Sequence, residues 1–300
     1  MNNDISNKPL VSVVIPTYKR PDTLGRAIES VLNQTYNNIE IVVVDDNIRD
    51  SEFHKKTLEV IRKYPSVIYL KTAGKTGGGA ARNFACRQAS GDYLTFLDDD
   101  DVYLPKKVDK QIIFMLNNDL DFSYEDCALY DVDDNLKDYR NLNYVESFTK
   151  QELLRQHILH SIGPSSVYMV KKDEFLKTEG FGEFISGQDW FLMLRCVEAD
   201  MKMGYLPGSD VKQYLHDGER ISLGTNKIKG ENNLYEWRKK YFPLFNYRER
   251  QYIRFRHRAV LAFSCMRSGM YSRGIAYAVA TLLTSPSYSI KEAISYCKKD

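Results

Sequence analysis

The chain is poor in cysteine and contains no long apolar run. Its five cysteines are scattered over 300 residues and never form a C-x-x-C pair, so their spacing predicts neither a disulfide framework nor a zinc finger. About 18 consecutive apolar residues occur nowhere, and we expect no segment to cross a bilayer as a helix. Residues 1–9 are polar and lack the apolar core of a signal peptide. These absences predict a reduced, cytoplasmic protein.

Net charge is also low. At +2 it gives no reason to expect that the molecule as a whole binds a polyanion such as nucleic acid. The charge is unevenly spread, however: from Asn246 onward ten Lys and Arg stand against three Asp and Glu, a balance of +7 that leaves −5 for residues 1–245. An acidic body with a basic tail indicates that the tail meets something anionic, such as a membrane face or a partner.

What remains is the composition of a globular protein, with 43% hydrophobic and 27% charged residues. The first 110 residues alternate between continuously apolar runs and stretches with apolar residues at helical spacing. The runs that predict strands are 11–15, 39–44, 67–70 and 93–97. The stretches that predict helices are 22–33, 52–64, 80–89 and 105–116. This alternation predicts an α/β fold with a doubly wound, mainly parallel sheet and helices on both faces.

Beyond about residue 120 the alternation fades. Residues 121–150 are rich in Asp, Asn and Tyr, which predicts short antiparallel strands and loops. We also expect a strand at 165–170 and helices at 151–159, 189–198, 250–268 and 271–284. The expected organisation is therefore one large domain in two halves, 1–120 and 121–230, followed by a basic helical tail over 231–300.

Polar residues follow three of the four predicted strands at the point where each strand ends. They are Pro16, Thr17 and Tyr18 after the first strand, Asp45 and Asp46 after the second, and Asp98 to Asp101 after the fourth. The carboxyl ends of parallel strands share one edge, where open α/β sheets bind ligands. Four successive carboxylates raise one another's pKa unless a cation is present, and oxygen ligands select Mg²⁺ or Mn²⁺. The alternative is a solvated acidic loop ahead of a helix N-terminus.

A glycine-rich segment, residues 74–79, precedes the third predicted helix. It is not a Walker A loop, since Tyr69 stands where that motif needs glycine, and it lacks the G-x-G-x-x-G order. It is therefore either a flexible loop or a loop near donor phosphates. Arg82, just inside the helix, would face a phosphate or pair with an acidic strand end.

Several short motifs stand in a characteristic order and spacing. They are VSVVIPTY (11–18), SVLNQT (30–35), IVVVDD (41–46), ARN (81–83), GDY (91–93), FLDDDD (96–101), GFG (180–182) and GQDWFLMLR (187–195). This set resembles the inverting family 2 glycosyltransferases of GT-A fold, of the kind that builds bacterial surface polysaccharides. The resemblance covers about residues 10–222, and the tail is not covered with the same specificity.

The resemblance implies that a sugar is transferred, with inversion, from a nucleotide-diphosphate donor, a UDP-sugar, to a hydroxyl of a saccharide or lipid-linked saccharide acceptor. The enzyme would be a hexosyl- or N-acetylhexosaminyltransferase that binds the donor with residues 1–120 and the acceptor with residues 121–230. The residues implied at the nucleotide sugar are Pro16, Thr17, Tyr18, Asp46, Arg82, Asp98 and Asp99. The D-x-D motif falls on Asp98 and Asp100, with Asp100 as the direct ligand of Mn²⁺ or Mg²⁺; Asp99 and Asp101 are alternatives one register away.

The family's catalytic base is the Asp of a Glu-Asp pair, which here reads Gln188-Asp189. The resemblance therefore implies Asp189 as the base, whereas the residues alone also allow an N-cap or a salt bridge to Arg195. Further contacts to the diphosphate or the acceptor would come from Gln188, Trp190, His216 and Arg220. Trp190 would stack on a sugar or pack against the sheet.

Two alternative functions would use the same acidic edge. One is that of a nucleotidyltransferase. The other is that of a catalytically silent nucleotide-sugar-binding protein, which the replacement of the family's Glu by Gln188 would favour. The tail also has two interpretations. Its arginines are Arg248, Arg250, Arg254, Arg256 and Arg258, interleaved with apolar residues. Its helices would pack on the catalytic domain or on a second subunit of a homodimer. Alternatively, the arginines rest on the anionic inner face of the cell membrane, which would make the protein peripheral there.

Overall fold

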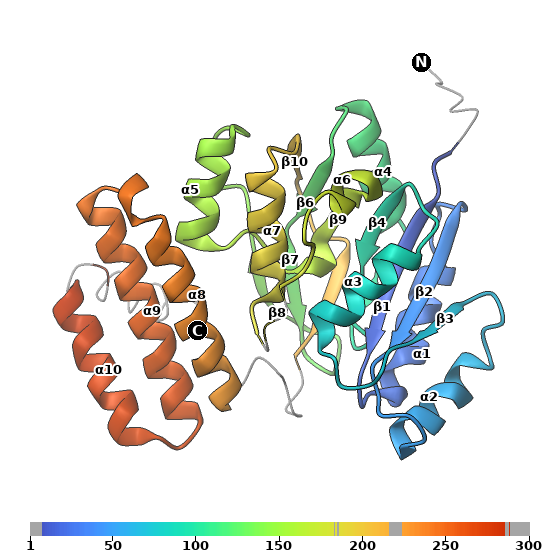
Figure 1. Cartoon of the computed structure of the whole chain (residues 1–300), viewed down its shortest axis with the longest axis horizontal. Helices are drawn as coiled ribbons and strands as arrows, with labels where there is room; N and C mark the ends of the chain where they lie inside the picture. Colours follow the sequence, from blue (N-terminus) through green and yellow to red (C-terminus); the bar gives the residue numbers. More distant parts are fainter. Residues whose placement is uncertain (1–7, 183, 185, 216–223, 286–287, 289–300) are drawn as a thin grey trace. The chain divides into compact units, whose positions relative to one another are not determined.

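The computed structural model describes residues 8–182, 184, 186–215, 224–285 and 288. The chain forms two compact units, and Figure 1 labels their elements. The first comprises Met1–Leu154, Ile162–Glu183 and Gln188–Asp217, and the second Arg155–Ser161, Phe184–Gly187 and Gly218–Asp300. Among the described helices, none combines the length and the apolar character that a bilayer crossing needs.

The first unit is built on a seven-stranded sheet in the order β10-β6-β9-β4-β1-β2-β3 (Figure 1). Its strands are β1 (Val11–Thr17), β2 (Ile39–Asp45), β3 (Ile68–Lys71), β4 (Tyr93–Phe96), β6 (Phe122–Glu125), β9 (Tyr168–Lys171) and β10 (Met203–Leu206). Neighbours pair in parallel, except that β9 runs antiparallel to both β4 and β6. The middle of β1 and β2 is continuously apolar and buried, as in a sheet covered on both faces. The predicted mainly parallel α/β fold is confirmed.

Four helices link the strands of this sheet and set its switch point. They are α1 (Pro21–Leu32), α2 (Glu52–Ile61), α3 (Gly78–Gln88) and α4 (Lys107–Asn117). α1 and α2 lead from β1 outward to β2 and β3, whereas α3 returns the chain to β4 on the other side of β1. Because such crossovers are right-handed, α3 lies on the opposite face from α1 and α2. The strand order reverses between β1 and β4, which is where open α/β sheets bind ligands.

A smaller sheet in the order β5-β11-β7-β8 continues from this edge. Its strands are β5 (Val102–Tyr103), β11 (Val211–Tyr214), β7 (Cys127–Tyr130) and β8 (Leu136–Arg140). β7 and β8 form an antiparallel pair within the region predicted to hold short antiparallel strands. β5 begins directly after Asp101, so the acidic run connects the large sheet to the small one.

Short helices complete the first unit, and one predicted strand is displaced. The helices are α6 (Lys172–Leu176), α7 (Gln188–Glu198) and the 3₁₀ turn η1 (Ser165–Val167). The strand predicted at 165–170 therefore begins only at Tyr168, because Ser165 and the two residues after it form the turn. A hydrogen bond from the Tyr168 amide to the Ser165 carbonyl closes that turn. The turn leads directly into β9, which lies between β4 and β6.

The second unit is helical. It comprises α8 (Gly224–Lys240), η2 (Phe242–Leu244), α9 (Tyr247–Arg267), α10 (Tyr271–Thr284) and the end of α5 (Lys150–His160). α9 lies between α8 and α10 and packs on both (Figure 1). The sequence pattern missed α8, because it is rich in Lys, Asn and Gly and has no continuous apolar stripe. α9 starts three residues earlier than predicted, since Asn246 and Glu249 form a capping box at its N-terminus.

The tail arginines make internal contacts. Arg250 donates to the carbonyl of Phe245 at 2.7 Å and Arg256 to that of Leu159 at 2.6 Å. Arg258 donates to the carbonyl of Ala280 at 3.2 Å. The side chains of these three arginines therefore satisfy helix-end and loop carbonyls of the helical unit.

Candidate active site

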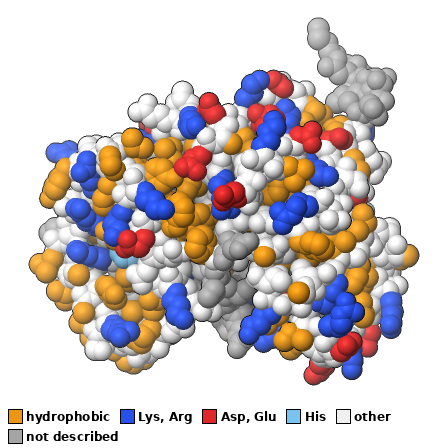
Figure 2. Space-filling model, in the orientation of Figure 1, with side chains coloured by type: hydrophobic (Ala, Val, Ile, Leu, Met, Phe, Trp, Pro, Cys, Tyr) orange, Lys and Arg blue, Asp and Glu red, His pale blue; other side chains and the backbone are white. Residues whose placement is uncertain are grey.

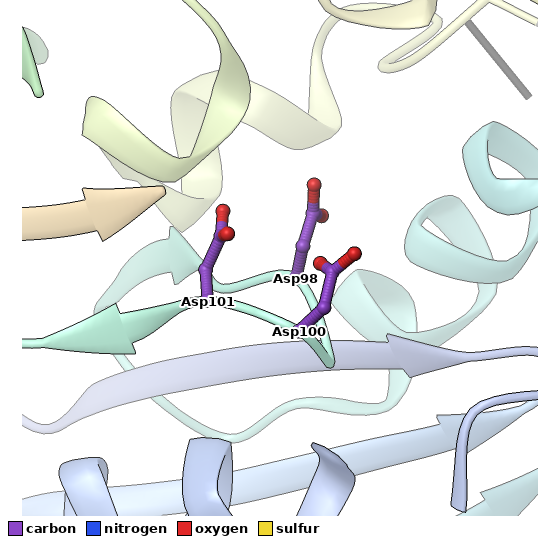
Figure 3. Close-up of side chains that lie close together, drawn as sticks. All are labelled: Asp98, Asp100 and Asp101. Atoms are coloured by element: carbon purple, nitrogen blue, oxygen red, sulfur yellow. The ribbon is translucent and has the colours of Figure 1, made fainter. Parts of the chain in front are cut away.

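The acidic run between β4 and β5 brings three carboxylates together. Ligand atoms of Asp98, Asp100 and Asp101 lie within 4.8 Å of one another, and Figure 3 shows the side chains projecting from the same loop. The carboxylates of Asp99, Asp100 and Asp101 belong to buried residues, so this is not a solvated acidic loop. The grouping arises because the chain turns here from the large sheet into the small one, and the Tyr214 amide of β11 donates to Asp101 Oδ1 at 3.0 Å.

The electrostatics of this run favour a bound cation. Burial, with the neighbouring charge of Asp100, raises the pKa of Asp99 to about 7. The same two causes raise the pKa of Asp101 well above its usual range. A divalent ion would remove this cost, and the hard oxygen donors of Asp98, Asp100 and Asp101 fit Mg²⁺ or Mn²⁺. Asp98 and Asp100, the predicted pair, thus lie in one cluster with Asp101.

Arg20, which sequence reasoning missed as a site residue, lies against the acidic run. Its guanidinium pairs with Asp100 and, at 3.4 Å, with Asp99 Oδ1. It stands at the end of the β1 loop, immediately before Pro21 begins α1. Arg26 of α1 donates to the backbone carbonyl of Asp100 at 2.7 Å. Both contacts join positions more than seventy residues apart, so only the folded chain reveals them.

Arg82 of α3 joins the acidic run to the start of α7. Its guanidinium pairs with Asp98 and donates to Gln188 Oε1 at 3.4 Å. It lies 5.4 Å from the centroid of the Phe181 ring and is buried. The sequence predicted that Arg82 faces a phosphate or pairs with an acidic strand end, and the structure shows the pairing with the strand end at Asp98.

Asp189 occupies the first turn of α7. Burial raises the pKa of Asp189, and the positive charge of Arg82 opposes that rise. Ser165 of η1 donates hydrogen bonds to the carboxylate, which also lower its pKa. Asp189 is the second residue of α7 rather than its N-cap, and Arg195 pairs with Glu179 at 2.5 Å. The charges of Asp98 and Asp189 thus both act on Arg82.

The end of β2 is tied to the glycine-rich loop. The carboxylate of Asp46 accepts hydrogen bonds from the Thr72 hydroxyl at 2.6 Å and from the Thr76 hydroxyl at 2.7 Å. It also accepts from the backbone amides of Thr76 at 2.9 Å and Gly77 at 2.8 Å. Asp46 therefore holds residues 72–77 in place ahead of α3. Its neighbour Asp45 accepts from Tyr69 at 2.8 Å and meets His54 Nδ1 at 2.8 Å.

The glycines of this loop permit a close approach to the chain ahead of α7. A Cβ at Gly79 would lie 2.3 Å from the Gly182 carbonyl, and one at Gly78 would lie 3.1 Å from Gln188 Oε1. The 2.3 Å approach to a backbone carbonyl requires glycine at position 79, whereas at position 78 the side chains of Arg82 and Gln188 would have to shift. The loop is thus shaped by Asp46 at one end and by close packing at the other.

The remaining predicted site residues are placed as follows. Thr17 ends β1 and is buried next to Asp99, while Pro16 and Tyr18 are half-buried on either side of it. Trp190 is 4% exposed and meets the Phe191 ring edge-on at 5.1 Å. His216 and Arg220 lie outside the described residues.

The fold and the acidic cluster define an α/β protein with a candidate ligand site at the carboxyl ends of its parallel strands, and comparisons with known proteins give its family. Residues 12–176 match the family model of Glycosyl transferase family 2. An uncharacterized glycosyltransferase of Methanocaldococcus jannaschii is 32% identical over 269 residues, which cover 80% of this chain and 88% of that protein. The chain therefore belongs to glycosyl transferase family 2, which confirms the resemblance and sets the nucleotidyltransferase alternative aside.

Two further proteins are similar to this chain, one in sequence and one in fold. The Escherichia coli UDP-Glc:alpha-D-GlcNAc-diphosphoundecaprenol beta-1,3-glucosyltransferase WfgD is 33% identical over 222 residues, covering 73% of this chain and 81% of WfgD. The crystal structure of S. aureus TarS 1–349 in complex with UDP-GlcNAc superimposes with a TM-score of 0.61 at 17% identity. That superposition covers 92% of this chain and 81% of the TarS chain, and it confirms the GT-A-like fold.

Proposed function

We propose that the protein transfers a hexosyl or N-acetylhexosaminyl group from a UDP-sugar to a hydroxyl of a lipid-linked saccharide, with inversion, in the synthesis of a surface polysaccharide. The observation that carries the proposal is the cluster of Asp98, Asp100 and Asp101 at the switch point, with Arg82 between it and Asp189. The relatives support the substrates: WfgD is named for UDP-Glc and a diphosphoundecaprenol acceptor, and TarS is complexed with UDP-GlcNAc.

The leaving group of this reaction is a nucleoside diphosphate, whose charge must be neutralised as it departs. Asp100 and Asp98 would hold Mg²⁺ or Mn²⁺, which supplies that neutralisation as a Lewis acid. Arg20 pairs with Asp99 and Asp100 and so limits the repulsion within the acidic run. Thr17, Tyr18 and Pro16 at the end of β1 would line the nucleotide pocket.

The acceptor hydroxyl must lose its proton as it attacks the anomeric carbon. Asp189 would accept that proton, and the raised pKa of its buried carboxyl strengthens it as a base. The charge of Arg82 keeps the carboxylate ionised, because it lowers the same pKa. One direct displacement converts an α-linked UDP-sugar into a β-glycoside, which agrees with the β-linkage in the name of WfgD.

The test is a transfer assay with UDP-glucose and UDP-GlcNAc as donors and a GlcNAc-diphosphate carrying a short lipid as acceptor. We expect transfer with Mn²⁺ or Mg²⁺, none with EDTA, and a β-linked product by NMR. Asp100→Ala should lose the metal-dependent activity, whereas Asp133→Ala, at an exposed acidic residue of the β7–β8 turn, should retain it. Transfer that survives EDTA would remove the metal from the proposal, and an α-linked product would remove inversion.

A further inference from the structure

We propose that the outer face of α10 docks the protein on a lipid bilayer surface that carries anionic headgroups. This inference extends the proposed function, since a lipid-linked acceptor resides in such a surface. It rests on three observations from the helical unit: the inverted polarity of α10, the single sign of the charges on α10 and the end of α9, and the internal hydrogen bonds of three other tail arginines.

The polarity of α10 is the reverse of that of a helix in a soluble protein. Its buried residues are Gly274 and Thr281, and a Cβ at Gly274 would lie 2.6 Å from Met266 Sδ of α9. Its large apolar side chains instead point outward. They are Tyr271, Ile275, Val279, Leu282 and Leu283, each at least half exposed. A soluble helix buries its apolar stripe, so this face is built to be covered by something apolar.

The exposed apolar surface continues onto α9 near the turn at Gly269. Phe263 is 57% exposed and Met266 is 42% exposed. Figure 2 shows hydrophobic and basic side chains side by side on the visible face of this unit. A helix of 14 residues is about 21 Å long, which suits a helix that lies in the plane of the interface.

The charged residues of α10, and of α9 beyond its first turn, all have one sign. No Asp or Glu occurs between residues 250 and 290 of the chain. Arg267 and Arg273 are exposed on either side of Gly269, and the Arg267 guanidinium lies 5.4 Å from the Phe263 ring centroid. Basic residues beside an exposed apolar stripe match the headgroups and acyl chains of an anionic bilayer. The same arrangement disfavours a second copy, because a two-fold contact through this face would bring these arginines together.

The structure also changes which basic residues would contact the bilayer. Arg250, Arg256 and Arg258, from the arginine cluster in the sequence, donate to carbonyls inside the helical unit. Arg267 and Arg273 are exposed and flank the apolar face. The proposed docking surface is therefore α10 with the end of α9, where exposed arginines stand beside exposed apolar side chains.

The test is cosedimentation of the full chain with vesicles of phosphatidylglycerol and phosphatidylcholine, against vesicles of phosphatidylcholine alone. Ile275→Ser with Leu283→Ser should weaken binding by about tenfold or more, because two apolar side chains no longer leave water. Arg267→Gln and Arg273→Gln should each weaken binding to the anionic vesicles by about fivefold. Raising salt from about 0.1 M to about 1 M should reproduce the arginine effect, since the Debye length falls to about 3 Å.

The matched control is Val132→Ser with Leu136→Ser, which changes two apolar residues that are 70% and 52% exposed in the first unit. The control should bind vesicles like the native chain, and the α10 variant should keep its native thermal stability and its thermal shift with UDP and Mn²⁺. These readouts separate loss of docking from misfolding and from failure of the proposed transfer reaction.

Three results would overturn the docking proposal. The first is equal vesicle binding by the native chain and the α10 variant. The second is a native chain that sediments as a dimer, becomes a monomer in the α10 variant and ignores vesicles, which would assign the face to a second copy. The third is a severalfold rise in vesicle binding when residues 289–300 are deleted, which would assign the face to the chain's own C-terminal segment.

Discussion

At the scale of single residues, the site is governed by how one arginine is shared between two acidic groups. Arg82 pairs with Asp98, and its charge also acts on Asp189. The chain has Gln188 where the resemblance leads one to expect Glu, and Gln188 accepts a hydrogen bond from the same guanidinium. A neutral residue at this point leaves the full charge of Arg82 available to the two aspartates. Two predictions belong at this scale.

The first prediction is that Asp189→Asn separates catalysis from donor binding. The amide keeps the shape of the side chain and can still accept the hydrogen bond from Ser165, but it cannot take a proton. We expect kcat to fall by about 10²-fold or more. Titration calorimetry should give a UDP affinity close to that of the native chain. A collapse of UDP affinity would show that Asp189 belongs to the donor site or to the fold.

The second prediction concerns the pH profile of Gln188→Glu. A carboxylate at this position competes for Arg82 and adds a like charge beside Asp189, so it raises the pKa of Asp189 further. A base with a higher pKa loses its proton at higher pH, and the acid limb of kcat should therefore move to higher pH. Gln188→Met, which adds no charge, should leave the limb in place. An unchanged limb in both variants would contradict the role of Asp189 as the titrating base.

At the scale of elements, loops and buried pairs decide how the site is held. Asp46 collects four hydrogen bonds from residues 72–77 and thereby fixes the loop that leads into α3. Asp46→Ala should leave four donors without this acceptor, so the loop loosens and Arg82 is less well placed. We expect faster proteolysis within residues 72–78 and weaker UDP binding, by about tenfold. Proteolysis and UDP binding at native levels would show that the loop does not depend on Asp46.

Glu125 at the end of β6 and Lys107 at the start of α4 are both buried, and the charge of Lys107 acts on Glu125. Burial raises the pKa of Glu125 to about 8, and burial lowers the pKa of Lys107 to about 8. Because the charge of Lys107 opposes the rise at Glu125, Lys107→Met should raise the pKa of Glu125 further. A raised folded-state pKa gives stability that is complete below the unfolded value near 4.3 and is lost as pH rises through the folded value.

The expected outcome is therefore a pH-dependent loss of stability in Lys107→Met. Urea unfolding should show a larger loss at pH 9 than at pH 5, because only above about pH 8 does the variant hold a proton on Glu125 that the native chain has released. The extra loss is about 1.4 kcal/mol for each pH unit over which this difference extends. Adding Glu125→Gln should remove most of the difference between the two pH values. Equal losses at pH 5 and pH 9 in the single variant would show that Lys107 acts through packing alone.

At the scale of the whole molecule, sequence reasoning recovered what depends on local pattern. Continuous apolar runs between amphipathic stretches predict β1 to α4, because buried parallel strands need both faces covered. The convergence of the β1, β2 and β4 ends followed from the parallel sheet. The sequence could not show that β9 inserts antiparallel between β4 and β6, since pairing between distant strands leaves no local signal. It also missed α8, whose residues form no apolar stripe.

The candidate site likewise has features that the local sequence predicts and features that depend on long-range contacts. The acidic run was visible because four carboxylates in succession need a physical explanation. Two sets of contacts join positions far apart in the sequence and could not be predicted from it. They are those of Arg20 with Asp99 and Asp100, and that of Asp46 with the glycine-rich loop. Arg20 carried one signal that could have been used, namely a basic residue just beyond the end of β1 and before the proline that starts α1.

The last prediction follows from the fact that each of the two units consists of three separate segments of the chain. The helical unit takes Arg155–Ser161 and Phe184–Gly187 from the middle of the sequence as well as everything from Gly218 onward. Arg155 pairs with Glu249 at 2.6 Å. Gly187 has a φ of +88°, which favours glycine, and a Cβ there would lie 3.0 Å from Leu234. A fragment of residues 1–217 would therefore keep two segments whose partners have been removed.

We expect the fragment of residues 1–217 to aggregate or to melt without cooperativity, because its segment 155–161 carries the buried side chains of residues 156–159 and would lose its partners Glu249 and Arg256. A fragment of residues 1–285 keeps Glu249, Arg256 and Leu234, which contact these segments, and it should melt cooperatively within a few degrees of the full chain. Circular dichroism melts and gel filtration of the two fragments make the comparison. A cooperative melt of the shorter fragment near that of the full chain would show that the first unit folds on its own, and that the helical unit is an independent addition to it.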